Sequence, residues 1–163
     1  MNQDQDIITK SQENQQKFKY MTAALKQAEK AALQNEVPVG AVIVYKDKII
    51  ARAYNKREQN QEFHAHAEFL AMMKAAKKIG SWRLEDCDIY VTMEPCPMCA
   101  GAMIQSRVRS LYYGASDPKA GVAESMIHLF ELPFNHKITV ESGIMAEESQ
   151  KILKTFFKKL RDK

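Results

Sequence analysis

The sequence has few cysteines and no long hydrophobic run. Its three cysteines are an odd number and too few for a disulfide framework, so we expect a reducing compartment. No apolar stretch approaches the roughly 20 residues that a helix needs to cross a bilayer. Residues 1–16 are polar and lack the basic-then-apolar pattern of a signal peptide. Together these absences predict a cytoplasmic protein with no membrane partner.

Acidic and basic residues are nearly balanced along the chain. The formal net charge of +4 permits a polyanionic partner without requiring one. A hydrophobic content of 45% and a charged content of 27% are typical of a globular domain. No internal repeat or linker divides the 163 residues. We expect residues 1–16, which are rich in Asn, Gln, Asp and Glu, to form a flexible tail before one folded domain over residues 17–163.

The hydrophobic pattern after residue 16 predicts helices that alternate with strands. A helical stripe begins at Lys17 and ends before Val37-Pro38, and two strands over residues 39–45 and 48–53 form a hairpin through Lys46-Asp47. After a polar loop over residues 55–63, we expect helices over residues 66–79, 97–106, 124–130 and 146–160, and strands over residues 88–93, 109–114 and 137–141. This order predicts an α/β protein with a mostly parallel sheet that has helices on both faces. The hairpin makes the sheet mixed.

Two short motifs carry most of the chemical information. Pro95-Cys96-Pro97-Met98-Cys99 brings two sulfurs within reach of one ion, and His66-Ala67-Glu68 lies thirty residues upstream of Cys96. Ligands His66, Cys96 and Cys99 would leave one position of a tetrahedral zinc ion open, as catalytic zinc sites do. Zinc lowers the pKa of water in that position to about 7, far below that of bulk water. Glu68, held off the metal, could accept and return that proton.

Each of these residues also has a simpler interpretation. The cysteine pair could be a redox dithiol or incidental, and Glu68 could be a first-turn glutamate that the helix dipole favours. Cys87 is badly placed as a fourth ligand, because a nine-residue extended stretch spans up to about 30 Å. The remaining histidines are expected in loop, surface or capping positions; they are His64, His128 and His136. Residues two apart on a regular helix diverge, so His66 must lie at the cap or in a distorted first turn to share a site with Glu68.

Longer segments make the chain resemble the bacterial tRNA-specific adenosine deaminases, which convert the wobble adenosine of an anticodon to inosine. The segments are EVPVGAVIV (36–44), HAHAEFLAM (64–72), VTMEPCPMCAGAMIQSRV (91–108) and YYGASDPKAG (112–121). The resemblance covers roughly residues 17–160. It implies a cytidine-deaminase-like three-layer α/β/α sandwich with a mixed five-stranded sheet. It also implies one Zn²⁺ per subunit, a homodimer, and a tRNA anticodon stem-loop as partner.

The same resemblance implies roles for individual residues. His66, Cys96 and Cys99 would bind zinc, and Glu68 would be the acid and base. Asn55 would hydrogen-bond the flipped base, Val39 would pack against it, and the backbone near Ala67 would complete the pocket. Asp117 would contact a neighbouring nucleotide. Turn formation is the alternative role for both Asn55 and Asp117.

The last predicted helix carries further candidate RNA contacts. Phe156 and Phe157 would line a groove for the anticodon loop, with core packing as the alternative. Lys158 and Lys159 would contact phosphates, with a solvated helix face as the alternative.

The leading hypothesis is therefore a zinc-dependent hydrolase that deaminates wobble adenosine in tRNA. The closest alternative is a deaminase of small molecules such as guanine, cytosine or dCMP. A zinc-stabilised RNA-binding module without catalysis is a third possibility. Glu68 argues against such a module, because binding needs no unligated carboxylate beside the metal.

Overall fold

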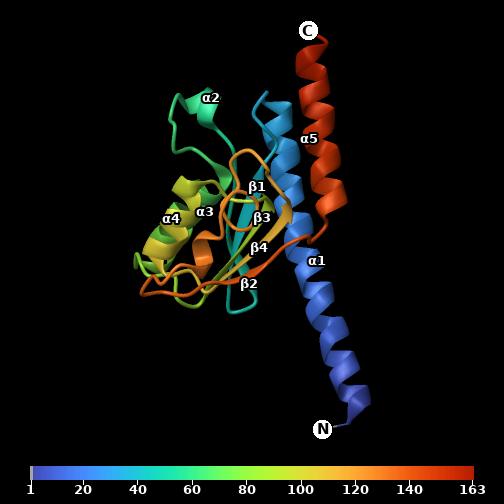
Figure 1. Cartoon of the computed structure of the whole chain (residues 1–163), viewed down its shortest axis with the longest axis vertical. Helices are drawn as coiled ribbons and strands as arrows, with labels where there is room; N and C mark the ends of the chain where they lie inside the picture. Colours follow the sequence, from blue (N-terminus) through green and yellow to red (C-terminus); the bar gives the residue numbers. More distant parts are fainter. Residues whose placement is uncertain (1) are drawn as a thin grey trace.

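A five-stranded sheet forms the centre of the molecule (Figure 1). The structure is a computed structural model, and it describes residues 2–163. In sequence order the strands are β1 (Gly40–Tyr45), β2 (Lys48–Tyr54), β3 (Cys87–Met93), β4 (Ser110–Ala115) and β5 (Thr139–Glu141). They are arranged as β2-β1-β3-β4-β5, so β2 and β5 are the edge strands.

The sheet is mixed, as predicted, but it is not mostly parallel. β1 pairs antiparallel with both β2 and β3, whereas β3–β4 and β4–β5 are parallel pairs. The hairpin turns the chain back from β1 to β2. The crossover that follows then places β3 parallel to β2, on the other side of β1, so β1 opposes both neighbours. Position 46 (φ 50°) and position 47 (φ 60°) form the predicted two-residue hairpin turn.

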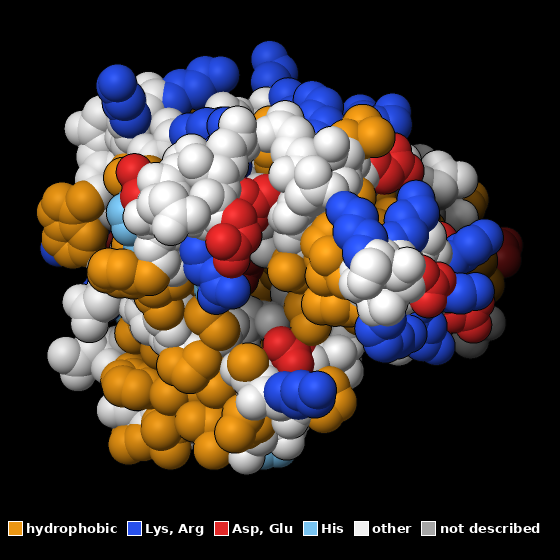
Figure 2. All heavy atoms as spheres, turned by 90° about the horizontal axis from the view of Figure 1, so that it is seen from above, with side chains coloured by type: hydrophobic (Ala, Val, Ile, Leu, Met, Phe, Trp, Pro, Cys, Tyr) orange, Lys and Arg blue, Asp and Glu red, His pale blue; other side chains and the backbone are white. Residues whose placement is uncertain are grey.

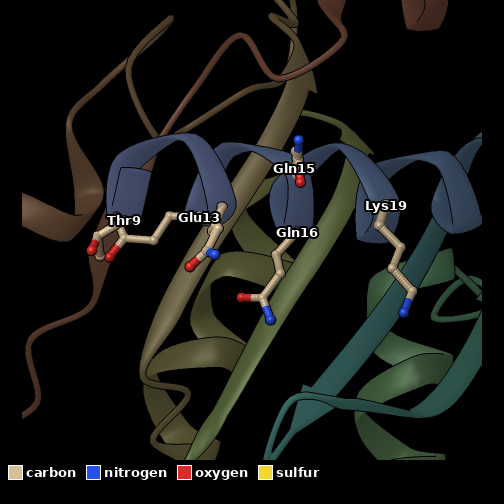
Figure 3. Close-up of a pocket in the computed structure, with 6 residues that line it drawn as sticks. Thr9, Glu13, Gln15, Gln16 and Lys19 are labelled. Carbon is tan, nitrogen blue, oxygen red and sulfur yellow. The ribbon is translucent and has the colours of Figure 1, made fainter. Parts of the chain in front are cut away.

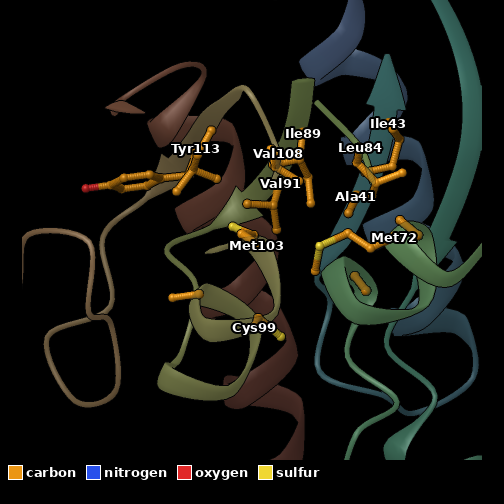
Figure 4. Packing of buried hydrophobic residues seen from close by; sticks show 14 of the residues in the cluster. Ala41, Ile43, Met72, Leu84, Ile89, Val91, Cys99, Met103, Val108 and Tyr113 are labelled. Atoms are coloured by element: carbon orange, nitrogen blue, oxygen red, sulfur yellow. The ribbon is translucent and has the colours of Figure 1, made fainter. Parts of the chain in front are cut away.

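Helices cover both faces of the sheet, which confirms the predicted three layers (Figure 1). α1 (Gln3–Leu33) and α5 (Ala146–Arg161) lie on one face, and α3 (Ala67–Ile79) and α4 (Pro97–Ser106) lie on the other. The larger core lies under α3 and α4, where Ile43 and Val91 of the sheet pack with Met72 and Met103 (Figure 4). On the α1 face, a Cβ at Gly40 would collide with the helix backbone at Ala24, so only glycine allows this close approach.

The first helix begins at Gln3 and not at Lys17, so the start expected from the sequence is wrong. Residues 3–16 are exposed and contribute nothing to the core, but no glycine or proline interrupts them. Asp4 and Asp6 in the first turn also complement the helix dipole. All six residues that line the pocket in Figure 3 belong to α1, and none of them belongs to the predicted site. Flexibility of residues 1–16 stays a prediction.

Two loops also differ from the prediction. A short helix α2 (Arg57–Asn60) forms within the loop before His66, and the helix expected over residues 124–130 is only a 3₁₀ turn, η1 (Leu129–Glu131). The segment around residues 122–126 forms turns, and the backbone N–H groups at positions 123–125 donate to the carboxylate of Glu94. None of the helices within residues 2–163 is long and apolar enough to span a membrane.

Candidate metal centre and substrate pocket

His66, Cys96 and Cys99 come together where two helices begin. His66 is the N-cap residue of α3 and has an extended backbone (φ −82°, ψ 150°), as the shared site with Glu68 requires. Cys96 caps α4 in the same way, and Cys99 lies in the first turn of that helix. The Nδ1 atom of His66 lies 3.5 Å from the sulfur of Cys96 and 3.5 Å from that of Cys99. The three ligand atoms all lie within 4.8 Å of one another.

This cluster fits a zinc ion. Bond lengths of about 2.0 Å to nitrogen and about 2.3 Å to sulfur, at a tetrahedral angle, place the two atoms about 3.5 Å apart. The observed separations of 3.5 Å agree with that value. One imidazole and two thiolates also match the donor preference of zinc. Within residues 2–163, no other group of at least three His, Cys, Asp or Glu side chains comes together in this way.

The two thiols of the cluster differ in acidity. A hydrogen bond from the Cys99 thiol, together with one from His66, lowers the pKa of Cys96 to about 4 against the opposing effect of burial. The hydrogen bond that Cys99 donates to Cys96, together with burial, raises the pKa of Cys99. The hydrogen bond to Cys96 raises the pKa of His66. The cluster thus already stabilises one negative charge at the amino terminus of α4, where the helix dipole favours it.

Glu68 lies in the first turn of α3 and is almost completely buried, with 4% of its surface exposed. Burial raises the pKa of Glu68 to about 7, although a hydrogen bond from its own backbone N–H and the nearby His66 lower it. Its carboxylate is not part of the ligand cluster. A buried carboxyl group beside a metal site can hold a proton or release it, as the sequence predicts for Glu68.

Asn55 links the end of β2 to the start of α3. Its Oδ1 atom accepts a hydrogen bond of 2.8 Å from the backbone N–H of Ala67. Its own backbone N–H donates to the carbonyl oxygen of Val39 at 3.2 Å. The three residues predicted to line the base pocket are therefore in contact, next to His66. The bond to Ala67 fixes the amide orientation and leaves Nδ2 as the donor that can face a ligand.

Comparison with known proteins agrees with this geometry. The family model of the MafB19-like deaminases matches residues 15–161. The tRNA-specific adenosine deaminase of Bacillus subtilis is 50% identical over 145 residues, which cover 88% of this chain and 90% of the relative. That of Rickettsia bellii is also 50% identical, over 87% of this chain and 100% of the relative. The chain belongs to the tRNA-specific adenosine deaminase family.

Solved structures support the same assignment of the deaminase. A structure from work on A-to-I editing by tRNA:A34 deaminases at the wobble position is 43% identical, with a TM-score of 0.80 over 82% of this chain and 98% of the other. The guanine deaminase of Bacillus subtilis is less similar, at 28% identity and a TM-score of 0.58 over 72% of this chain and 85% of the other. The small-molecule alternative therefore has the weaker support.

Asp117 of the deaminase lies in the loop after β4. Its Oδ1 atom accepts hydrogen bonds from the backbone N–H groups of Lys119 (3.1 Å) and Ala120 (3.3 Å). This is the turn role that the sequence offers as the alternative to an RNA contact. The nucleotide contact stays a prediction.

The aromatic residues of α5 have unequal exposure. Phe156 is buried (9% exposed), whereas Phe157 is 41% exposed and packs edge-to-face with it at 5.4 Å between ring centroids. The burial of Phe156 favours the packing alternative, and an RNA contact by Phe157 stays a prediction. Lys158 and Lys159 are exposed. Figure 2 shows lysine and arginine side chains spread over the end of the molecule that carries the carboxyl terminus.

The residues excluded as ligands have other partners in the deaminase. His64 lies 3.7 Å from Glu62, and His128 lies 3.6 Å from Glu131. The Nε2 atom of His136 lies 2.6 Å from the carbonyl oxygen of Val108. Cys87 is fully buried in the main core, away from the ligand cluster, and burial raises its pKa to about 11.

Sequence reasoning missed Glu94. This side chain is 3% exposed, and its carboxylate accepts hydrogen bonds from the loop after β4. The only sequence signal was an acidic residue between a strand and Pro95, which by itself predicts nothing about its distant partners.

Proposed function

We propose that this protein hydrolytically deaminates adenosine to inosine at the wobble position of a tRNA anticodon. The observation that carries the proposal is a His-Cys-Cys cluster beside a buried glutamate that is not a ligand. The 50% identity to curated tRNA-specific adenosine deaminases supports tRNA as the substrate.

His66 Nδ1 and the sulfurs of Cys96 and Cys99 would hold one Zn²⁺ per subunit. When bound, zinc supplies Lewis-acid activation of water for attack on C6 of the adenine. The protein holds its three ligands at the ends of rigid elements, two of them on α4 and one at the cap of α3. A metal bound there would therefore have a fixed position relative to Glu68 and Asn55.

Glu68 would carry the protons of the reaction. Its carboxylate takes one proton from the attacking water and delivers it to N1 of the adenine ring. It then transfers the second proton to the exocyclic nitrogen, which leaves as ammonia, so adenosine and water give inosine and ammonia. Burial keeps Glu68 away from bulk solvent, so protons pass between water, carboxylate and base.

Asn55 and Val39 would orient the base. The Oδ1 atom of Asn55 is bonded to Ala67, so its Nδ2 would donate to an acceptor on the flipped adenine. Val39 is buried beside it and would pack against the ring. An anticodon loop already exposes its bases, so moving one into this pocket costs less than in a duplex.

The proposal also includes the RNA partner and the assembly. Lys158, Lys159 and Phe157 on α5, together with Asp117, would contact the anticodon stem-loop. Large apolar side chains are exposed, among them Trp82, Met126 and Leu132, and Figure 2 shows hydrophobic side chains gathered over one part of the surface. Such a surface supports a homodimer. We expect the enzyme to act in the cytoplasm.

Incubation of the purified protein with an unmodified tRNA that has adenosine at the wobble position tests the proposal. We expect inosine, detected by mass spectrometry of the nucleosides. The matched control, Glu68→Ala, should retain zinc and tRNA binding but form no inosine. Turnover of free guanine or cytosine with no activity on tRNA would instead support the small-molecule alternative.

A further inference from the structure

The carboxylate of Glu94 is buried without a cationic partner among the described residues. Glu94 follows the last residue of β3 and precedes Cys96 by two positions. It is 3% exposed, and none of the ion pairs within residues 2–163 includes it. Burying a carboxylate costs free energy unless hydrogen bonds replace its water.

One surface loop supplies these hydrogen bonds. Oε1 of Glu94 accepts from the backbone N–H of Asp117 (3.0 Å) and from the hydroxyl of Ser125. Oε2 accepts from the backbone N–H groups of Ala123 (3.0 Å), Glu124 (2.9 Å) and Ser125 (3.0 Å). A single side chain thus holds both ends of the segment 117–125.

This loop is built around the carboxylate and lies against the metal centre. The N–H of Val122 donates to the carbonyl oxygen of Pro95, next to Cys96, at 3.1 Å. The loop also closes on itself, because Gly121 donates to the carbonyl oxygen of Asp117 at 2.8 Å. A Cβ at Gly121 would overlap the carboxyl group of Glu94, so the close fit requires glycine there.

We infer that Glu94 is a positioning residue that presents the loop of residues 117–125 to the RNA beside the metal centre. The inference rests on the proposed function, because it makes this loop part of the substrate site. Pro118 and Lys119 are exposed in the loop, and Asp117 is half-buried. Glu94 itself, being buried, acts on the substrate only through the loop.

The test compares Glu94→Gln with Ser125→Ala and with Glu29→Gln, which changes an exposed glutamate on α1. For Glu94→Gln we expect the KM for an anticodon stem-loop to rise at least about tenfold, the effect of losing one hydrogen bond to a charged group. Its kcat should change much less, and its zinc content should equal that of the wild type. Ser125→Ala should change KM in the same direction by less, and Glu29→Gln should match the wild type.

Limited trypsin digestion provides a readout that is independent of activity. Release of the loop in Glu94→Gln should speed cleavage after Lys119 at least about tenfold, measured by mass spectrometry of the intact protein. A cleavage rate and a KM of Glu94→Gln that both equal those of Glu29→Gln would overturn the inference. So would faster cleavage with an unchanged KM, since the loop would then have no part in binding.

Two further outcomes are also decisive. If Glu94→Gln does not fold, Ser125→Ala decides, and unchanged cleavage and KM in that variant overturn the inference. If the wild-type protein forms no inosine, the proposed function fails. In that case the affinity of each variant for the anticodon stem-loop is measured in place of KM. An affinity of Glu94→Gln equal to that of the wild type would overturn the inference about Glu94, independently of the failed function.

Discussion

At the scale of single residues, the three cysteines have different chemical environments. Cys87 and Cys99 are fully buried, whereas Cys96 is partly exposed. In metal-free protein we therefore expect iodoacetamide near neutral pH to alkylate Cys96 first, since its thiolate is both accessible and favoured. Zinc should protect it. Cys87, whose pKa is raised to about 11, should stay unmodified, and its alkylation in folded protein, seen by peptide mapping, would contradict the structure.

Asn55 combines two functions that substitutions can separate. Asn55→Asp keeps an acceptor for the N–H of Ala67 but removes the Nδ2 donor, so we expect an unchanged Tm with a raised KM for the RNA. Asn55→Ala removes both, so stability should also fall, by about 1 kcal/mol, the usual cost of losing a helix cap. Thermal unfolding and steady-state kinetics measure the two effects. Equal stability of the two variants would show that the bond to Ala67 contributes nothing.

At the scale of helices and strands, predictions succeeded where the signal was local. Helix α4 spans residues 97–106 as predicted, because Pro97 suits a helix start and the pattern ends at Ser106. The helix predicted over residues 124–130 is wrong, because the segment forms turns whose backbone N–H groups bind a side chain thirty residues away, a contact that no local pattern reveals. The antiparallel pairing of β1 with β3 was equally inaccessible, because it depends on contacts between segments distant in the sequence, whereas the hairpin of β1 with β2 has a local signal.

The exposed first half of α1 gives a prediction at this scale. Residues 3–16 make no buried contacts, and the family match begins at residue 15. Deletion of residues 2–14 should therefore leave the Tm within about 2 °C of the full-length value, since almost no apolar area is lost. Zinc content should also be unchanged. A loss of several degrees in calorimetry would show that this segment packs against something, for example a second copy.

At the scale of the whole molecule, the site forms at the end of the sheet where strands β2, β3 and β4 have their carboxyl ends. Asn55 follows β2, Glu94 and Cys96 follow β3, and Asp117 follows β4. Open α/β sheets place ligands at this end. The metal ligands could be predicted from the sequence because their types and spacing are diagnostic. Glu94 and the link from Asn55 to Ala67 could not, because they depend on how this end of the sheet is assembled in space.

The charge on α5 leads to a prediction about RNA binding. Lys158 and Lys159 are exposed near the end of this helix, where each could contact a phosphate. Replacing both with Glu should weaken binding of an anticodon stem-loop and reduce the slope of log K against log salt by about 0.7 per lost contact. Zinc content should not change. The matched control replaces Lys77 and Lys78, exposed near the end of α3, with Glu. Fluorescence anisotropy across a salt series measures both, and an equal slope in the two double variants would exclude α5 from the RNA-binding surface.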